Sequence, residues 1–232
     1  MPFSQEALAR LEADAAQIIA KYPRSRSALL PLLHLVQAEE GHVSPDGIAF
    51  CAGQLGLTDA EVTAVATFYT MYKRHPAGEY HVGVCTNTLC AVMGGDAIYA
   101  SLTEHLGVGH NETTPDGKIS LEHVECNAAC IYAPVVMVNW EFFDNMTPGS
   151  TRQLVDDLRA GNEVSPSRGP RHLCTWREAS RILAGIPDGQ AADGPTAGPP
   201  DLVGLKIAKE RGWAAPSAAG EPAAGSAEEE PK

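Results

Sequence analysis

The sequence predicts an α+β protein, in which an N-terminal helical bundle precedes a small domain of helices packed on a mixed sheet. Apolar residues in the first 75 positions recur at steps of three and four, the period of one-sided helices. Between residues 76 and 165, short alternating stretches are separated by helical ones. Four of the six cysteines stand in two close pairs within that second part, which indicates where the chemistry lies.

The N-terminal part, residues 1–75, is expected to form a bundle without chemistry of its own. Ser44 before Pro45 is typical of a helix N-cap followed by proline at the first helical position. Thr58 and Glu61 fit a capping box that begins another helix. The apolar positions that show the helical period are Leu8, Leu11, Ala15, Ile18 and Ile19, then Leu29, Leu30, Leu33 and Val36.

The second part, residues 76–165, alternates between strand and helix patterns. A strand is expected from Tyr80 into Cys85, because Tyr80, Val82 and Val84 alternate with small or polar neighbours. The following order is helix, strand, strand and helix. The expected segments are 91–106, 119–124, 135–138 and a last helix that starts at Ser150.

The third part, residues 166–232, is predicted to be an extension with a short helix and a mostly disordered tail. Thr175 and Glu178 can cap a helix that runs to Leu183. After residue 185, Pro, Gly and Ala dominate, and such a chain buries too little apolar surface to offset its conformational entropy. Inside the tail, residues 202–213 can form a short amphipathic turn or two that docks on a partner, but so short a segment is also consistent with a solvated linker.

The charge and the N-terminus exclude several classes of function. The formal net charge of −12 repels nucleic-acid phosphate and anionic lipid, so neither is expected as a partner. No apolar run approaches the eighteen or so residues of a membrane span, so direct membrane insertion is not expected. The first residues lack the basic and apolar regions of a signal peptide. A cytoplasmic protein is therefore predicted.

The paired cysteines predict a metal centre. Cys85 and Cys90 are separated by four residues, and Cys126 and Cys130 by three. Each iron of a [2Fe–2S] cluster needs two protein thiolates, a demand that two close pairs meet. Because the first pair follows one strand and the second follows another, both loops are expected at the same edge of the sheet. The lone Cys51 and Cys174 are expected to be a buried apolar side chain and a free thiol.

Structural zinc is the main alternative for four cysteines, although these spacings are untypical of zinc knuckles. A zinc-stapled adaptor would be colourless and would carry no electrons. Thioredoxin-type thiol exchange needs C-x-x-C, which is absent. A Rieske centre would replace two cysteines by histidines; His81 and His123 are near, but neither pair lacks a cysteine.

The loop around the first pair suits an anionic cluster. The backbone amides of residues 86–88 are expected to donate hydrogen bonds to sulfur, and Gly94 and Gly95 to allow close backbone approach. No lysine or arginine lies between Cys85 and Lys118, so nothing basic there neutralises an added electron. A low reduction potential follows.

The residues around the cysteines resemble a known family. The stretch CTNTLC with Gly94 and Gly95, and then VECNAACIYAPVVMVN (124–139), is similar to the 24-kilodalton (E) subunit of proton-pumping NADH:quinone oxidoreductase, respiratory complex I. Upstream, residues 29–48 and 65–78 resemble that family's helical segment. Thr147 and Pro148 match its Leu-Thr-Pro after the last strand. The likeness covers roughly residues 5 to 160.

The resemblance implies a thioredoxin-like α/β ferredoxin domain behind the helical bundle. It implies a [2Fe–2S] cluster, whose four ligands match Cys85, Cys90, Cys126 and Cys130. It also implies a flavoprotein subunit that binds FMN and NADH, and a larger iron–sulfur subunit, as partners. This chain would bind neither FMN nor NADH, having no nucleotide-binding glycine loop. As a subunit of an oxidoreductase and translocase, it would have no substrate site of its own.

Within such a complex the chain would lie on the cytoplasmic face of the cell membrane. Similar modules occur in NAD-linked formate dehydrogenases and NAD-reducing hydrogenases, which are the alternative parents. The sequence also departs from the family. Residues 127–129 are Asn-Ala-Ala where C-x-G-x-C is frequent, Met146 replaces a common leucine, and Trp140 stands where a small acidic residue is usual.

Overall fold

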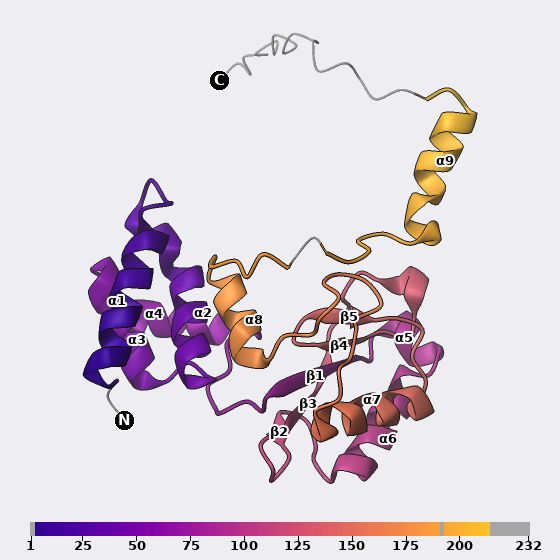
Figure 1. Cartoon of the computed structure of the whole chain (residues 1–232), viewed down its shortest axis with the longest axis horizontal. Helices are drawn as coiled ribbons and strands as arrows, with labels where there is room; N and C mark the ends of the chain where they lie inside the picture. The colour runs from indigo at the N-terminus through magenta and orange to yellow at the C-terminus, as the bar shows by residue number, and fades with distance from the viewer. Residues whose placement is uncertain (1–2, 191–192, 214–232) are drawn as a thin grey trace, which may run out of the picture. The chain divides into compact units, whose positions relative to one another are not determined.

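The computed structural model describes residues 3–190 and 193–213, in two compact units that divide after Thr196 (Figure 1). The first unit holds the helical bundle, the sheet and its helices. The predicted boundaries at residues 75 and 165 lie inside it and remain predictions. No helix of the described residues is long and apolar enough to cross a bilayer.

The bundle consists of α1 (Gln5–Ile19), a 3-10 turn η1 (Ser25–Ala28), α2 (Leu29–Glu40), α3 (Pro45–Leu55) and α4 (Asp59–Phe68). The predicted caps are present. Ser44 accepts a hydrogen bond from the Gly47 amide, and Thr58 and Glu61 form a reciprocal capping box. The apolar faces meet in one core, which includes Leu11, Ile18, Leu32, Leu33, Val36 and Val62.

The sheet has five strands in the order β2-β3-β1-β4-β5. They are β1 (Tyr80–Cys85), β2 (Glu112–Thr113), β3 (Ile119–Val124), β4 (Val136–Val138) and β5 (Glu141–Phe143). The central pair β1 and β3 is parallel and the other pairs are antiparallel, so the predicted mixed sheet is confirmed. β2 and β5 are short edge strands that the alternation pattern did not reveal.

One face of the sheet is covered by α6 (Gly95–Leu106) and α7 (Pro148–Ala160) (Figure 1). Side chains of successive strand residues point to opposite faces, so Val82 and Val84 of β1 point into this layer. The buried cluster there includes Val82, Val84, Ile98, Leu102, Leu121, Leu154 and Leu158. Helices on a mixed sheet agree with the predicted α+β class.

Two predicted helix starts are wrong. The helix expected over 91–106 is divided into α5 (Thr88–Val92) and α6, because Gly94 has a φ of +116°, which an α-helix does not accommodate. α7 begins at Pro148 rather than after Ser150. Thr147 is its N-cap, and Ser150 is the partner in the capping box.

The C-terminal helix α8 (Trp176–Leu183), capped by Thr175 as predicted, packs against α2 of the bundle. Trp176 is 1% exposed, and its indole N–H donates to the carbonyl of Gly41 over 2.9 Å. Ala184, after the helix, belongs to the bundle core. The segment that follows the sheet and α7 therefore completes the bundle.

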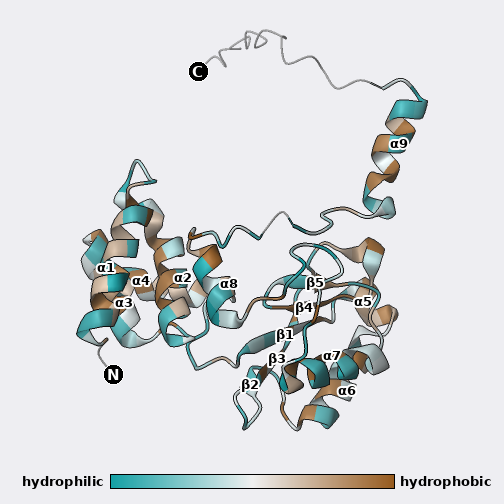
Figure 2. Cartoon of the chain, viewed as in Figure 1, coloured by the Kyte–Doolittle hydropathy of each residue, from teal (hydrophilic) through white to brown (hydrophobic). Residues whose placement is uncertain are grey.

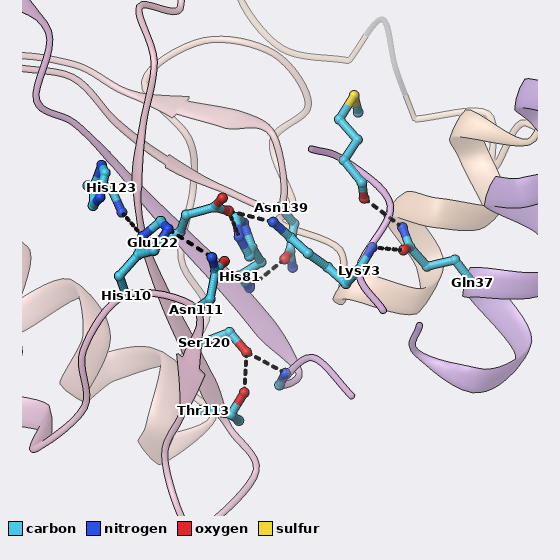
Figure 3. A network of polar contacts seen from close by, with 12 residues as sticks. Gln37, Lys73, His81, His110, Asn111, Thr113, Ser120, Glu122, His123 and Asn139 are labelled. Atoms are coloured by element: carbon cyan, nitrogen blue, oxygen red, sulfur yellow. Dashed lines mark hydrogen bonds and ion pairs between the residues drawn. The ribbon is translucent and has the colours of Figure 1, made fainter. Parts of the chain in front are cut away.

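A polar network joins the segment after α4 to the second face of the sheet (Figure 3). Glu122 of β3 accepts hydrogen bonds from His81 Nε2 over 2.6 Å and from Lys73 Nζ over 2.5 Å. The backbone amide of Lys73 donates to the side chain of Gln37 on α2 over 2.8 Å. Gln37 also donates to Ser180 of α8. Bundle, α8 and sheet are thus connected through buried polar groups.

Glu122 gives the first unit an acid-sensitive contribution to stability. Burial raises the pKa of its carboxyl, but hydrogen bonds from His81 and Lys73 outweigh burial and bring that pKa to about 2. A carboxyl whose pKa falls on folding stabilises the fold above its unfolded pKa, and this stabilisation disappears as the pH falls towards 2. We expect roughly 3 kcal/mol of the unfolding free energy to be lost in this window.

Urea unfolding of the wild type and Glu122→Gln at pH 7 and pH 3 measures this contribution. The variant should be less stable at pH 7, where it leaves Lys73 without its buried counterion, and should lose less stability between the two pH values. Equal losses in both proteins would contradict the prediction.

The second unit begins at Ala197 and is described to residue 213. It contains the turn η3 (Pro199–Leu202) and the helix α9 (Val203–Glu210), which lies within the segment whose sequence allows an amphipathic turn or two. Hydrophobic and hydrophilic residues both appear along α9 (Figure 2). Leu205 and Trp213 are each 62% exposed. The predicted disorder covers the tail after residue 185; within it the structure places η3 and α9, while residues 214–232 lie outside the described residues.

Candidate metal centre

The four paired cysteines meet at one edge of the sheet. Cys85 is the last residue of β1, and Cys90 lies on α5. Cys126 follows β3 by two residues, and Cys130 begins the 3-10 turn η2 (Cys130–Tyr132). Because β1 and β3 are parallel neighbours, their carboxyl ends lie at the same edge. This is the arrangement that the strand pattern predicted.

All four cysteines line a single cavity of about 220 Å³. Cys85 and Cys90 are buried, whereas Cys126 and Cys130 are exposed, so the cavity reaches from the sheet edge to the surface. The sulfurs of Cys126 and Cys130 lie 3.8 Å apart. The other lining residues are Asn87, Thr88, Leu89 and Val92.

The donor set fits a binuclear cluster. The four sulfurs surround one cavity, in two pairs. A [2Fe–2S] cluster spreads its ligands over two metals, with two thiolates on each, so this arrangement suits it.

Two thiols of this site, those of Cys90 and Cys130, have a raised pKa. Burial raises the pKa of Cys90 to about 11, although a hydrogen bond from the backbone of Val135 opposes the shift. The pKa of Cys130 is raised chiefly by its hydrogen bond with Cys126 and by the charge of that neighbour. Metal ligation requires the thiolates, so the positive charge of iron must offset both burial and mutual repulsion.

The backbone amides that donate hydrogen bonds to cysteine sulfur are only partly those expected from the sequence. The amide of Thr88 donates to the Asn87 side chain over 3.1 Å, and that of Thr86 to the Val124 carbonyl over 3.5 Å. Neither amide is therefore free for a cluster. Instead, the amide of Ala128 donates to the sulfur of Cys126 over 3.4 Å. The second loop supplies the hydrogen bond to sulfur that the first was expected to supply.

Gly95 is where the loop backbone comes closest to the ligands. A Cβ at this position would collide with the carbonyl oxygen of Cys85 and would lie 2.9 Å from that of Cys90. Separations under 3.0 Å force the backbone to move. The close approach expected at Gly95 is therefore present, and it holds α6 against both cysteines of the first pair.

Two features of the site were missed by the sequence reasoning. Apolar side chains on the cysteine-bearing segments are exposed: Val92, which lines the cavity, is 79% exposed, and Ile131 and Met93 are 60% and 57% exposed. Val92 and Met93 do not continue the helical period of the buried residues Ile98, Leu102 and Leu106. The sequence therefore contained a sign that these two side chains are exposed. A side-chain hydrogen bond also joins Asn87 to Glu125, next to Cys126. No sequence pattern indicated it.

The two other cysteines lie outside the site. Cys51 is fully buried in the bundle core, as expected, and burial raises the pKa of its thiol to about 12. Cys174 is a partly buried free thiol, whose pKa burial raises to about 11. Neither is poised to act as a nucleophile at neutral pH.

Known proteins resemble this chain over most of its length. The family described as thioredoxin-like [2Fe–2S] ferredoxin matches residues 15–159. The E subunit of the NADH-quinone oxidoreductase of Mycobacterium tuberculosis is 62% identical over 219 residues, which cover 94% of this chain and 86% of that protein. NADH-quinone oxidoreductase subunit 2 of Thermus thermophilus is 41% identical over 151 residues, covering 64% of this chain and 83% of that protein.

A solved structure shares the fold. The crystal structure of an NAD⁺-reducing [NiFe]-hydrogenase in its H₂-reduced state superposes with a TM-score of 0.52 at 18% identity. The superposition covers 57% of this chain and 22% of the hydrogenase chain. At this identity the likeness concerns the fold alone.

Proposed function

The chain belongs to the family of thioredoxin-like [2Fe–2S] ferredoxins, and we propose that it works as the electron-transferring E subunit of an NADH–quinone oxidoreductase. Its cofactor is the [2Fe–2S] cluster, which supplies one-electron chemistry when bound. The observation that carries the proposal is the meeting of four cysteines in one cavity at the sheet edge. The 62% identity to the mycobacterial protein favours this complex over a hydrogenase or formate dehydrogenase.

We assign ligand roles to the four cysteines. Cys85 and Cys90 would hold one iron, and Cys126 and Cys130 the other. We pair the cysteines in this way because the two members of each pair are close in the sequence and lie on the same short segment. The buried pair would face the protein and the exposed pair the surface, so electrons would enter or leave on the side of Cys126 and Cys130.

The surface around these cysteines supports a protein partner at this place. Four apolar side chains on the two cysteine-bearing segments are 45% to 79% exposed: Leu89 and Val92, which line the cavity, and Met93 and Ile131, which follow Val92 and Cys130 in the chain. We call them the apolar rim. Exposed apolar patches beside a cofactor are typical of interaction sites. The partner that fits the proposed reaction is a flavoprotein subunit that binds FMN and NADH and exchanges electrons with the cluster.

The rest of the assembly follows from the same proposal. A larger iron–sulfur subunit would accept the electrons, and the complex would hold this chain on the cytoplasmic face of the cell membrane. The bundle (1–75), the ferredoxin domain (76–165) and the extension (166–232) would be its three parts.

A charge in the apolar rim should separate partner binding from cluster binding. Val92→Asp places a carboxylate on a largely exposed side chain, so the fold and the iron content should not change. Affinity for the flavoprotein subunit should fall at least tenfold, because the carboxylate would be desolvated at the interface. Leu183→Asp, at an exposed apolar position on α8, is the matched control. Equal affinity for both variants would exclude the rim as the docking site.

The proposed function is tested by optical and EPR spectra of the anaerobically purified chain, before and after reduction with dithionite. A brown protein with two irons per chain, and a mixed-valence signal after reduction, is the expected result. A colourless protein with one zinc would overturn it and leave the zinc-stapled adaptor. Titration with the flavoprotein subunit and NADH then tests whether the cluster is reduced through the flavin.

A further inference from the structure

The side chain of Asn87 connects the two ligand loops. Its Oδ1 accepts a hydrogen bond from the Thr88 amide over 3.1 Å, and so caps α5, the helix that carries Cys90. Its Nδ2 donates to a carboxylate oxygen of Glu125 over 3.0 Å. Glu125 directly precedes Cys126. We call this Asn87–Glu125 hydrogen bond the loop bridge.

The loop bridge lies at the cavity rather than beside it. Asn87 is itself one of the residues that line the cavity with the four cysteines. Both partners are exposed, so the bond stands on the side from which the proposed flavoprotein approaches. A docked partner would exclude water here and would strengthen the effect of the Glu125 charge.

Within residues 3–190 and 193–213, Glu125 forms no ion pair with a basic side chain. Among the ion pairs of the described residues none involves this carboxylate, whose recorded partner is the neutral amide of Asn87. No lysine or arginine occurs between Cys85 and Lys118 either. The loop bridge thus fixes an unpaired negative charge next to one ligand of the cluster.

We propose that Asn87 is a positioning residue that locks the two ligand loops together, and that Glu125, held by it, lowers the reduction potential of the cluster. Reduction adds one electron to an already anionic centre and moves no proton in this step. A fixed negative charge nearby disfavours that addition. The inference rests on the proposed function, because it presumes a cluster on the four cysteines.

Glu125→Gln removes the charge and keeps an oxygen that accepts from Asn87. In EPR-monitored redox titrations of the full chain, we expect reduction to become about threefold to tenfold more favourable, where tenfold corresponds to 59 mV for one electron. The shift should shrink at high salt, because an exposed charge is screened. Glu104→Gln, an exposed carboxylate near the far end of α6, makes the same charge change and should leave the potential unaltered.

The positioning role is tested by exchanging the two partners. Asn87→Asp sets two carboxylates against each other, so the loops should separate and the cluster should be lost several-fold faster to a chelator. The double variant Asn87→Asp/Glu125→Gln restores a hydrogen bond between amide and carboxylate at the original net charge. It should recover the wild-type rate of cluster loss and the wild-type EPR line shape.

These experiments distinguish a failure of the inference from a failure of the proposed function. An unchanged potential in Glu125→Gln with an intact EPR signal would overturn the inference and leave the proposed function standing. A double variant as unstable as Asn87→Asp would overturn the positioning role. A wild-type chain that forms no iron–sulfur signal after reconstitution would overturn the four-cysteine assignment, and the inference with it.

Discussion

Replacing Cys126 by alanine should abolish the [2Fe–2S] cluster. The substitution leaves one iron with a single protein thiolate where two are needed. Because Cys126 is exposed, its removal creates no cavity in the core, and the fold itself should persist. Iron analysis should fall from two atoms per chain to a small residue, and the EPR signal of the reduced protein should vanish.

The matched controls are the two cysteines outside the site. Cys174→Ala should retain both irons, since this thiol lies on the segment before α8. Cys51→Ala should also retain them, although deleting a fully buried sulfur should lower the unfolding free energy by about 1–2 kcal/mol. Full iron occupancy in Cys126→Ala, or loss of iron in Cys174→Ala, would contradict the assignment of the ligands.

The second large effect is expected from a single methyl group at Gly95. In Gly95→Ala the new Cβ would collide with the carbonyl oxygens of Cys85 and Cys90, so either α6 or the first ligand loop must move. Moving the loop separates Cys85 from Cys90. We expect most of the iron to be lost, together with a fall of about 1–3 kcal/mol in the unfolding free energy. Iron content, EPR line shape and urea unfolding measure these effects.

Gly53→Ala is the control for adding a methyl group to a helix. Gly53 is an exposed residue of α3, and an added Cβ there meets no atom within 4 Å. This variant should keep its cluster and gain about 0.5–1 kcal/mol, since alanine is the better helix former. If Gly95→Ala also kept its iron and its EPR spectrum, the backbone contact at Gly95 would have no role in the site.

The sequence alone predicted those parts of the protein that depend on neighbours in the chain. The helix caps at Ser44, Thr58 and Thr175 use residues three positions apart, and each is present. The strand into Cys85 shows in its own alternation. The placing of each cysteine pair after a strand also showed in the chain, but that both pairs meet at one edge depends on the parallel pairing of β1 with β3, which the structure decided.

Only the tertiary structure decided how these parts are joined. Glu122 looked like one polar residue of a strand, but it is ionised between His81 and Lys73, which lie 41 and 49 positions away. Gly95 has the carbonyl oxygens of Cys85 and Cys90 packed against it, and Asn87 donates a hydrogen bond to Glu125, 38 positions away. Local periodicity reports which face of an element is buried, whereas these contacts depend on which element covers that face. That choice is made by the packing of the whole unit, and no short stretch of sequence contains it.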